Sequence, residues 1–325
     1  MNESRVFGRR HGKEIVADEL LAENCLGRSF DLAICASSPE PRALSVPRRL
    51  ASVFRDAGTV ICFNQLSSDR VRQSVDSELR RLCRGRTLDL DITRYDEFLQ
   101  WFAQEVRRIW EEKERAPEIL IDYSCLPKAY YVGVLSAATH TPGCRITYFY
   151  DTGKRPPSTW GTSEVDLIYA LPGFEGCPNQ DGRQAYLFSL GFDGHQTAAI
   201  EEVLQPRELY ALVADPGVEG ADANRAERAN REILASADGV IRSAVDDVIG
   251  VVSRCRDVVG VGGEGTGLVV VPVGPKPHAL ALGIVALLED RVTYLHVLTR
   301  VVPIRRIEAS GKYAVTRVDL STAPG

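Results

Sequence analysis

The chain lacks the sequence signals of several protein classes. None of its eight cysteines belongs to a C-x-x-C pair, which argues against a zinc ribbon and against a dense disulfide framework. No apolar run has the length of a membrane span, and the first residues, MNESRVFGRRHGKE, have no apolar core like that of a signal peptide. We therefore expect a reduced, cytoplasmic protein with no membrane contact, no metal site and no cofactor.

A strong charge of one sign and a phosphate-binding glycine motif are absent too. Lys and Arg number 39 against 44 Asp and Glu, so the net charge is only −5, and the chain has no general attraction for nucleic acid. No G-x-x-x-x-G-K-[ST] motif occurs. The glycine-rich segment 260–267 precedes an apolar strand instead of following one, so we interpret it as a loop and not as a dinucleotide-binding fingerprint. An anionic ligand would have to be held by a local site.

Short segments rich in Val, Ile and Leu alternate with helical patterns along the chain. Because these segments have no polar face, the alternation predicts an α/β fold with mainly parallel sheets covered on both faces. The 325 residues are enough for two doubly wound, Rossmann-like units, which we place at 1–173 and 174–325, joined through the Gly/Pro-rich segment 171–183. Residues 301–320 alternate around Ser310-Gly311 and predict a C-terminal β-hairpin in the second unit.

The two halves share landmarks at nearly constant spacing. Pro127-Lys128 and Pro275-Lys276 lie 148 residues apart, each between an apolar strand and a helix-like run. The strands that follow, 144–151 and 290–298, both contain R-x-T-Y, at an offset of 146. Chance similarity between two α/β domains is one explanation. The agreement of both landmarks favours the other, a tandem duplication of a whole domain.

The loops that leave the strands are the places to look for a ligand, because open parallel sheets bind ligands beyond the carboxyl ends of their strands. Glycines there let the backbone approach a ligand, the start of a helix favours an anion, and a lysine supplies a point charge for a phosphate. Roles as helix caps, turns and solvated charges remain an alternative for the same residues. The candidate ligand contacts are Ser37, Ser38, Asp122, Ser124, Lys128, Gly191, Gly194, Asp215, Gly274, Lys276 and His278.

One loop also offers candidate catalytic residues. Asp193 and His195 follow a predicted strand, and a histidine oriented by a carboxylate is suited to proton transfer near neutral pH. An Asp-Gly turn followed by a polar loop histidine is the plainer interpretation.

The order of elements, with a strand-turn-Lys-helix corner late in each half, resembles the CRISPR-associated Rossmann-fold (CARF) sensor domains. In that family the late corner reads Gly-Gly-Thr-Lys and faces a cyclic oligonucleotide. The resemblance implies that Gly274 and Lys276, and Lys128 in the first half, meet ligand phosphates, while the loop with Asp193 and Gly194 faces the same ligand. This chain departs from the pattern, since Pro275 replaces the Gly-Thr of the motif and SCLPK lacks both glycines.

Domains of this family pair to form one pocket from two Rossmann units. The resemblance therefore implies a pocket built by the tandem units, a homodimer, or a separate protein partner.

These observations predict a cytoplasmic protein that recognises a nucleotide or another phosphorylated ligand, as a sensor in antiviral defence or regulation. Two alternatives stay open. One is a hydrolase or transferase that acts on a nucleotide-type substrate, with Asp193 and His195 as catalytic residues. The other is a non-catalytic adaptor subunit of a larger complex.

Overall fold

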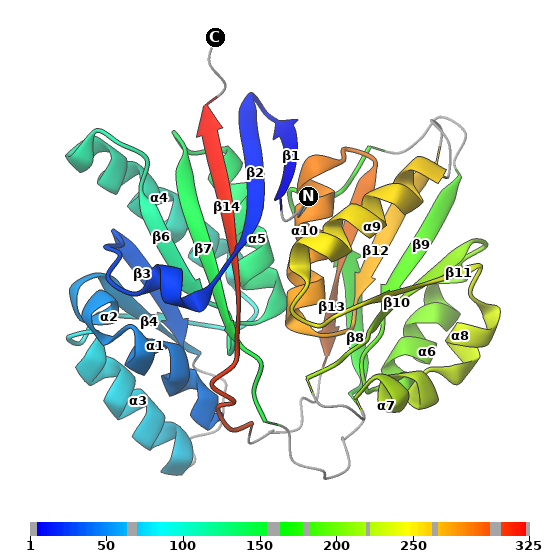
Figure 1. The fold of residues 1–325 in the computed structure, drawn as a ribbon, viewed down its shortest axis with the longest axis horizontal. Helices are drawn as coiled ribbons and strands as arrows, with labels where there is room; N and C mark the ends of the chain where they lie inside the picture. Colours follow the sequence, from blue (N-terminus) through cyan, green and yellow to red (C-terminus); the bar gives the residue numbers. More distant parts are fainter. Residues whose placement is uncertain are drawn as a thin grey trace. The chain divides into compact units, whose positions relative to one another are not determined.

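The computed structural model divides the chain into two compact units. The first unit contains residues 1–156 and 304–325, and the second contains 157–303. Each has its own mainly parallel sheet with helices packed against it (Figure 1), so the predicted α/β class is confirmed. The described residues are 5–63, 70–154, 163–177, 183–218, 222–261, 266–299 and 307–322. Within these ranges, no helix has both the length and the apolar character needed to cross a membrane.

The sheet of the first unit has eight strands in the order β1-β2-β14-β7-β6-β3-β4-β5. The five strands from β3 to β7 are parallel, in the spatial order 3-2-1-4-5 counted along the chain. The strand β14 pairs antiparallel with both β7 and β2, and β1 pairs antiparallel with β2. The strands are β1 (Arg5–Arg10), β2 (Lys13–Leu20), β3 (Leu32–Ala36), β4 (Gly58–Phe63), β5 (Thr87–Leu90), β6 (Glu118–Asp122), β7 (Cys144–Asp151) and β14 (Tyr313–Thr322).

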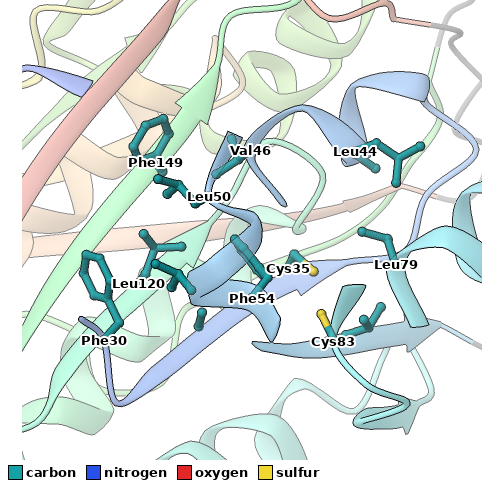
Figure 2. Packing of buried hydrophobic residues seen from close by; sticks show 14 of the residues in the cluster. Phe30, Cys35, Leu44, Val46, Leu50, Phe54, Leu79, Cys83, Leu120 and Phe149 are labelled. Atoms are coloured by element: carbon teal, nitrogen blue, oxygen red, sulfur yellow. The ribbon is translucent and has the colours of Figure 1, made fainter. Parts of the chain in front are cut away.

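Helices cover both faces of this sheet because its central strands have no polar face. All five residues of β3 are buried. On one face, Phe54 and Leu79 pack with Cys35 and Leu120 in a continuous apolar cluster (Figure 2). The helices and 3-10 turns of the unit are η1 (Ala22–Cys25), η2 (Pro41–Leu44), α1 (Ser45–Arg49), α2 (Ala51–Ala57), α3 (Arg70–Leu82), α4 (Tyr95–Lys113) and α5 (Lys128–Thr139).

The sheet of the second unit has six strands in the order β11-β10-β9-β12-β13-β8. The strands from β9 to β13 are parallel and repeat the spatial order 3-2-1-4-5, while β8 pairs antiparallel with β13. The strands are β8 (Val165–Ala170), β9 (Gln184–Ser189), β10 (Leu209–Ala214), β11 (Gly239–Ser243), β12 (Gly267–Pro272) and β13 (Val292–Thr299). The helices are α6 (Gly194–Leu204), α7 (Asp222–Ala229), α8 (Arg231–Ser236), α9 (Val248–Val261) and α10 (Lys276–Leu288).

The Pro-Lys corners occupy the same place in both units. Each follows the fourth parallel strand, β6 or β12, and Lys128 and Lys276 are the first residues of α5 and α10. The prolines before them have nearly the same backbone, with φ −63° and ψ 152° at Pro127 and φ −64° and ψ 152° at Pro275. Proline favours this extended conformation just before a helix, so the same dipeptide starts both helices.

The third residue of each of these helices makes the same kind of contact. The Tyr130 hydroxyl lies 3.2 Å from the carbonyl oxygens of Asp91 and Ile92, which follow β5, the third parallel strand. In the second unit, Nε2 of His278 lies 3.2 Å from the carbonyl oxygen of Ala244, which follows β11, again the third strand. The equivalence of the two corners therefore extends to their contacts across the sheet.

The C-terminal segment corrects the sequence prediction. Instead of forming a hairpin in the second unit, β14 lies between β2 and β7 in the sheet of the first. Gly311, with φ 73°, does form a turn, but Glu308 before it pairs with Lys154. Residues 300–306 lie outside the described part. Two flanking strands satisfy more backbone groups of β14 than a single hairpin arm would, and its apolar side chains Ala314, Val315, Val318 and Leu320 are buried.

Candidate functional site

A cleft of about 310 Å³ lies at the carboxyl edge of the second sheet. It is formed where the first turn of α6, which follows the central strand β9, meets the junction of α7 and α8. This is the edge at which open parallel sheets bind ligands. Lining residues with polar or aromatic side chains include Phe192, Asp193, His195, Arg228, Asn230 and Arg231.

Asp193 and Gly194 shape the α6 side of the cleft. The carboxylate of Asp193 caps α6, with one oxygen accepting the Gln196 N–H at 3.0 Å and the other the Ser163 N–H at 2.8 Å. A Cβ at Gly194 would lie 1.8 Å from the carbonyl oxygen of Ala229, at the end of α7. Only glycine fits between these two helices, so the Asp-Gly pair follows from capping and packing at this point.

His195 is exposed at the rim of the cleft. Among the described residues it makes no hydrogen bond, and both oxygens of Asp193 are engaged by backbone N–H groups. The structure therefore brings the two predicted catalytic residues to one cleft without a hydrogen bond between them. Their catalytic role stays a prediction.

Arginines from α7 and α8 form the opposite side. Arg228 and Arg231 line the cleft and also an adjoining open hollow of about 820 Å³. Arg231 is 4.0 Å from Glu232 in an exposed pair. Arg228 is exposed and, in the part of the chain that the structure describes, makes no hydrogen bond or ion pair. Arg225, one turn earlier, places its guanidinium 5.1 Å from the centre of the Phe192 ring.

Sequence reasoning missed these arginines because a charged residue on a helix is usually a solvated one. The signal was present as R-x-x-R-x-x-R over residues 225–231. The spacing of Arg225 and Arg228 keeps their side chains on nearby faces of α7, and Arg231 begins α8. Only the packing of α7 beside the β9 loop makes Arg228 and Arg231 line a cleft.

Asn230 connects the two sides of the cleft. Its Nδ2 donates hydrogen bonds of 2.8 Å to the carbonyl oxygens of Gly191 and Ala226, which joins the β9 loop to the end of α7. The side chain is only 2% exposed. Its Oδ1 is buried and accepts no hydrogen bond from the described residues.

The other predicted glycines of the second unit lie where two loops touch. A Cβ at Gly191 would be 2.8 Å from the Val273 carbonyl oxygen, and one at Gly274 would be 2.2 Å from Oγ of Ser189. The close approach that these glycines permit is thus between the β9 and β12 loops of the protein itself.

Asp215, Lys276 and His278 lie elsewhere around the same edge. Asp215 is half-exposed, 3.9 Å from Arg242. Lys276 is half-buried at the start of α10 and does not line the cleft. The His278 ring is fully buried in this structure, and its role as a ligand contact stays a prediction. Burial, which penalises the charged ring, lowers the pKa of His278 to about 4.

In the first unit, the predicted residues bond mainly with one another and with their neighbours. Ser37 donates to the Asp76 carboxylate, and Oγ of Ser38 accepts the Glu40 N–H at 3.2 Å. The Asp122 carboxylate accepts the Ser124 N–H at 3.0 Å, and Oγ of Ser124 accepts the Asp151 N–H at 2.9 Å. Lys128 is half-buried at the start of α5.

A buried arginine completes this cluster. Arg42 is 4% exposed, and its Nε lies 2.6 Å from the Glu40 carboxylate. Burial alone would lower the pKa of Arg42, but the attraction of Glu40 and Tyr150 holds that pKa well above its ordinary value. The neighbouring Asp151 carboxylate is fully buried and accepts N–H groups of Gly153 and Ser310 at 2.8 and 3.0 Å.

Comparisons with known proteins give no family. No family model matches the chain, and no curated protein matches its sequence. Among solved structures, a universal stress protein from Archaeoglobus fulgidus DSM 4304 is similar over 81% of this chain and 94% of its own, with 11% sequence identity and a TM-score of 0.19. We assign no function from a likeness of this strength.

Proposed function

We propose that the second unit binds a small anionic ligand of nucleotide type in the cleft between α6 and the α7–α8 junction. The observation that carries this proposal is Arg228, an exposed guanidinium that lines the cleft and, within the described ranges, makes no ion pair. A guanidinium presents a planar fork of donors that matches a phosphate.

The other charges of the cleft support the same ligand. Asp193 contributes a negative charge, but both of its oxygens already accept backbone N–H groups. Glu232 lies beside Arg231, so these two charges offset each other. The N-terminus of α6, an 11-residue helix, adds a partial positive charge at the same place. An anion is therefore attracted to the side where Arg228 lies.

The volume of the cleft sets the size of the ligand. Ligand pockets in proteins run from roughly 300 to 1,000 Å³, and about 310 Å³ is at the small end of that range. A mononucleotide suits this space better than a cyclic oligonucleotide. Phe192 provides an aromatic wall against which a flat ring can pack.

The wider proposal is that the chain is a cytoplasmic, CARF-like sensor that arose by tandem duplication. The shared strand order, the matching backbone at Pro127 and Pro275, and the parallel contacts of Tyr130 and His278 support the duplication. A role in antiviral defence follows only from the resemblance to CARF domains.

Titration calorimetry with adenosine 5′-monophosphate tests the binding proposal. We expect Arg228→Gln to weaken binding by roughly 10- to 150-fold, the worth of a charge-assisted hydrogen bond. The matched control is Arg207→Gln, because Arg207 is exposed in the same unit and does not line the cleft. Equal affinities for the two variants, or no binding to the unaltered protein, would refute the proposal.

A further inference from the structure

The orientation of the Asn230 amide is determined by its partners. Both of its 2.8 Å hydrogen bonds end on carbonyl oxygens, which only accept, so the atom between them must be Nδ2. The remaining atom, Oδ1, is an acceptor on a side chain that lines the cleft. It is buried and has no donor among the described residues. A buried acceptor without a donor is costly for a folded protein, and a bound ligand can supply the missing N–H or O–H.

The aromatic wall of the cleft is joined to this acceptor. Phe192 follows Gly191, whose carbonyl oxygen accepts one of the two Asn230 hydrogen bonds. Phe192 and Asn230 line the same cleft. The Arg225 guanidinium, 5.1 Å from the centre of the Phe192 ring, helps to fix that ring in place. The ring and the acceptor are therefore held at one place by a shared segment of chain.

We infer that the cleft selects mononucleotides whose base carries an exocyclic amino group over those with a keto oxygen at the same position. The base packs on Phe192 and its amino N–H donates to Oδ1 of Asn230. A keto oxygen there would meet Oδ1 with no proton between them, which leaves both oxygens unsatisfied. This inference rests on the proposed function, in which Arg228 holds the phosphate.

The test varies the ligand and leaves the protein unchanged, because Asn230 also supports the fold through Gly191 and Ala226. Adenosine and inosine 5′-monophosphates differ at one position of the purine, and cytidine and uridine 5′-monophosphates differ in the same way on a pyrimidine. By titration calorimetry, we expect the amino member of each pair to bind about 5- to 150-fold more tightly. Equal affinities within both pairs, or tighter binding of the keto members, would overturn the inference.

Ribose 5-phosphate distinguishes the failure of this inference from that of the proposed function. If all four nucleotides and ribose 5-phosphate fail to bind, both proposals fall. If the amino and keto nucleotides bind with equal affinity and Arg228→Gln lowers the affinity for all four, the proposed phosphate site is supported and the inference about the base is wrong.

Phe192→Leu gives a second, independent measurement. We expect this variant to bind adenosine 5′-monophosphate roughly 5-fold or more weakly, because stacking is lost. Its affinity for ribose 5-phosphate should be unchanged. Phe7→Leu is the matched control, since Phe7 is 58% exposed in the first unit. An equal loss for both ligands with Phe192→Leu would contradict the stacking of the base.

Discussion

The carboxyl edges of the two sheets have the same strand order and use their charged side chains differently. In the first unit, Arg42 is buried against Glu40, and Ser37 donates to Asp76. Ser37, Glu40 and Arg42 follow β3, the first parallel strand of that unit. In the second unit, the loop after β9, the first parallel strand there, opens on a cleft, where Arg228 has no partner among the described residues. The shared fold supplies the carboxyl edge in both units, while the loops decide whether that edge is filled by side chains of the protein or open as a cleft.

The largest expected effect comes from the tight contact beside the cleft. Gly194→Ala puts a Cβ 1.8 Å from the Ala229 carbonyl oxygen, and backbone on both sides cannot move away easily. We expect a loss of about 3 kcal/mol in the free energy of unfolding, the upper end for overpacking. Urea denaturation measures it.

Gly267→Ala is the control for this loss, because a Cβ at Gly267 would be no closer than 3.5 Å to its neighbours. Similar unfolding free energies for the two variants would show that α6 and α7 do not pack as tightly as described.

The next effect depends on pH and separates the equivalent residues Tyr130 and His278. Because burial lowers the pKa of His278 from 6.5 to about 4, the unfolded chain takes up this proton first as the pH falls. The contribution of neutral His278 is therefore complete above pH 6.5 and is lost between pH 6.5 and about 4. At the acid end of this range, the free energy of unfolding has decreased by about 3 kcal/mol through His278.

His278→Gln keeps a donor toward Ala244 and does not titrate, so its unfolding free energy should fall less steeply over this pH range than that of the unaltered protein. Tyr130→Phe should leave the steepness unchanged. Parallel pH curves for His278→Gln and the unaltered protein would contradict the buried, neutral histidine.

The smallest effect concerns the two lysine corners. Neither Lys128 nor Lys276 lines the cleft. Lys276, in the same unit as the cleft, therefore acts on a bound anion only through a partly screened charge. We expect Lys276→Ala to lower the affinity for adenosine 5′-monophosphate by at most about fivefold, the range of a surface charge pair. Lys128→Ala should have no measurable effect. A loss for Lys276→Ala as large as that for Arg228→Gln would place the phosphate at the Pro-Lys corner instead.

Local patterns in the sequence were enough to predict the α/β class and the corners at Lys128 and Lys276. Apolar strands, helical periodicity and a proline before a helix all act over a few residues, so they can be recognised without tertiary contacts. The C-terminal strand was predicted as a strand but assigned to the wrong unit. Alternation predicts that a segment pairs; it does not say with which strands.

The candidate site was predicted only in part, because its important contacts are long-range. The loop with Asp193 and Gly194, which the sequence singles out, lines the cleft. Arg228 and Asn230 gain their positions from the packing of α7 against the β9 loop, which no local pattern in the sequence reveals. The burial of His278 depends in the same way on the loop after β11.

The position of β14 has a consequence for the order in which the protein can be made. A ribosome completes residues 157–303, the whole second unit, before it reaches residues 313–322. Until then β2 and β7 have no strand between them, since β14 is the neighbour of both. The second unit can therefore fold while the nascent first unit still exposes two open strand edges, and the sheet begun first is the last to close.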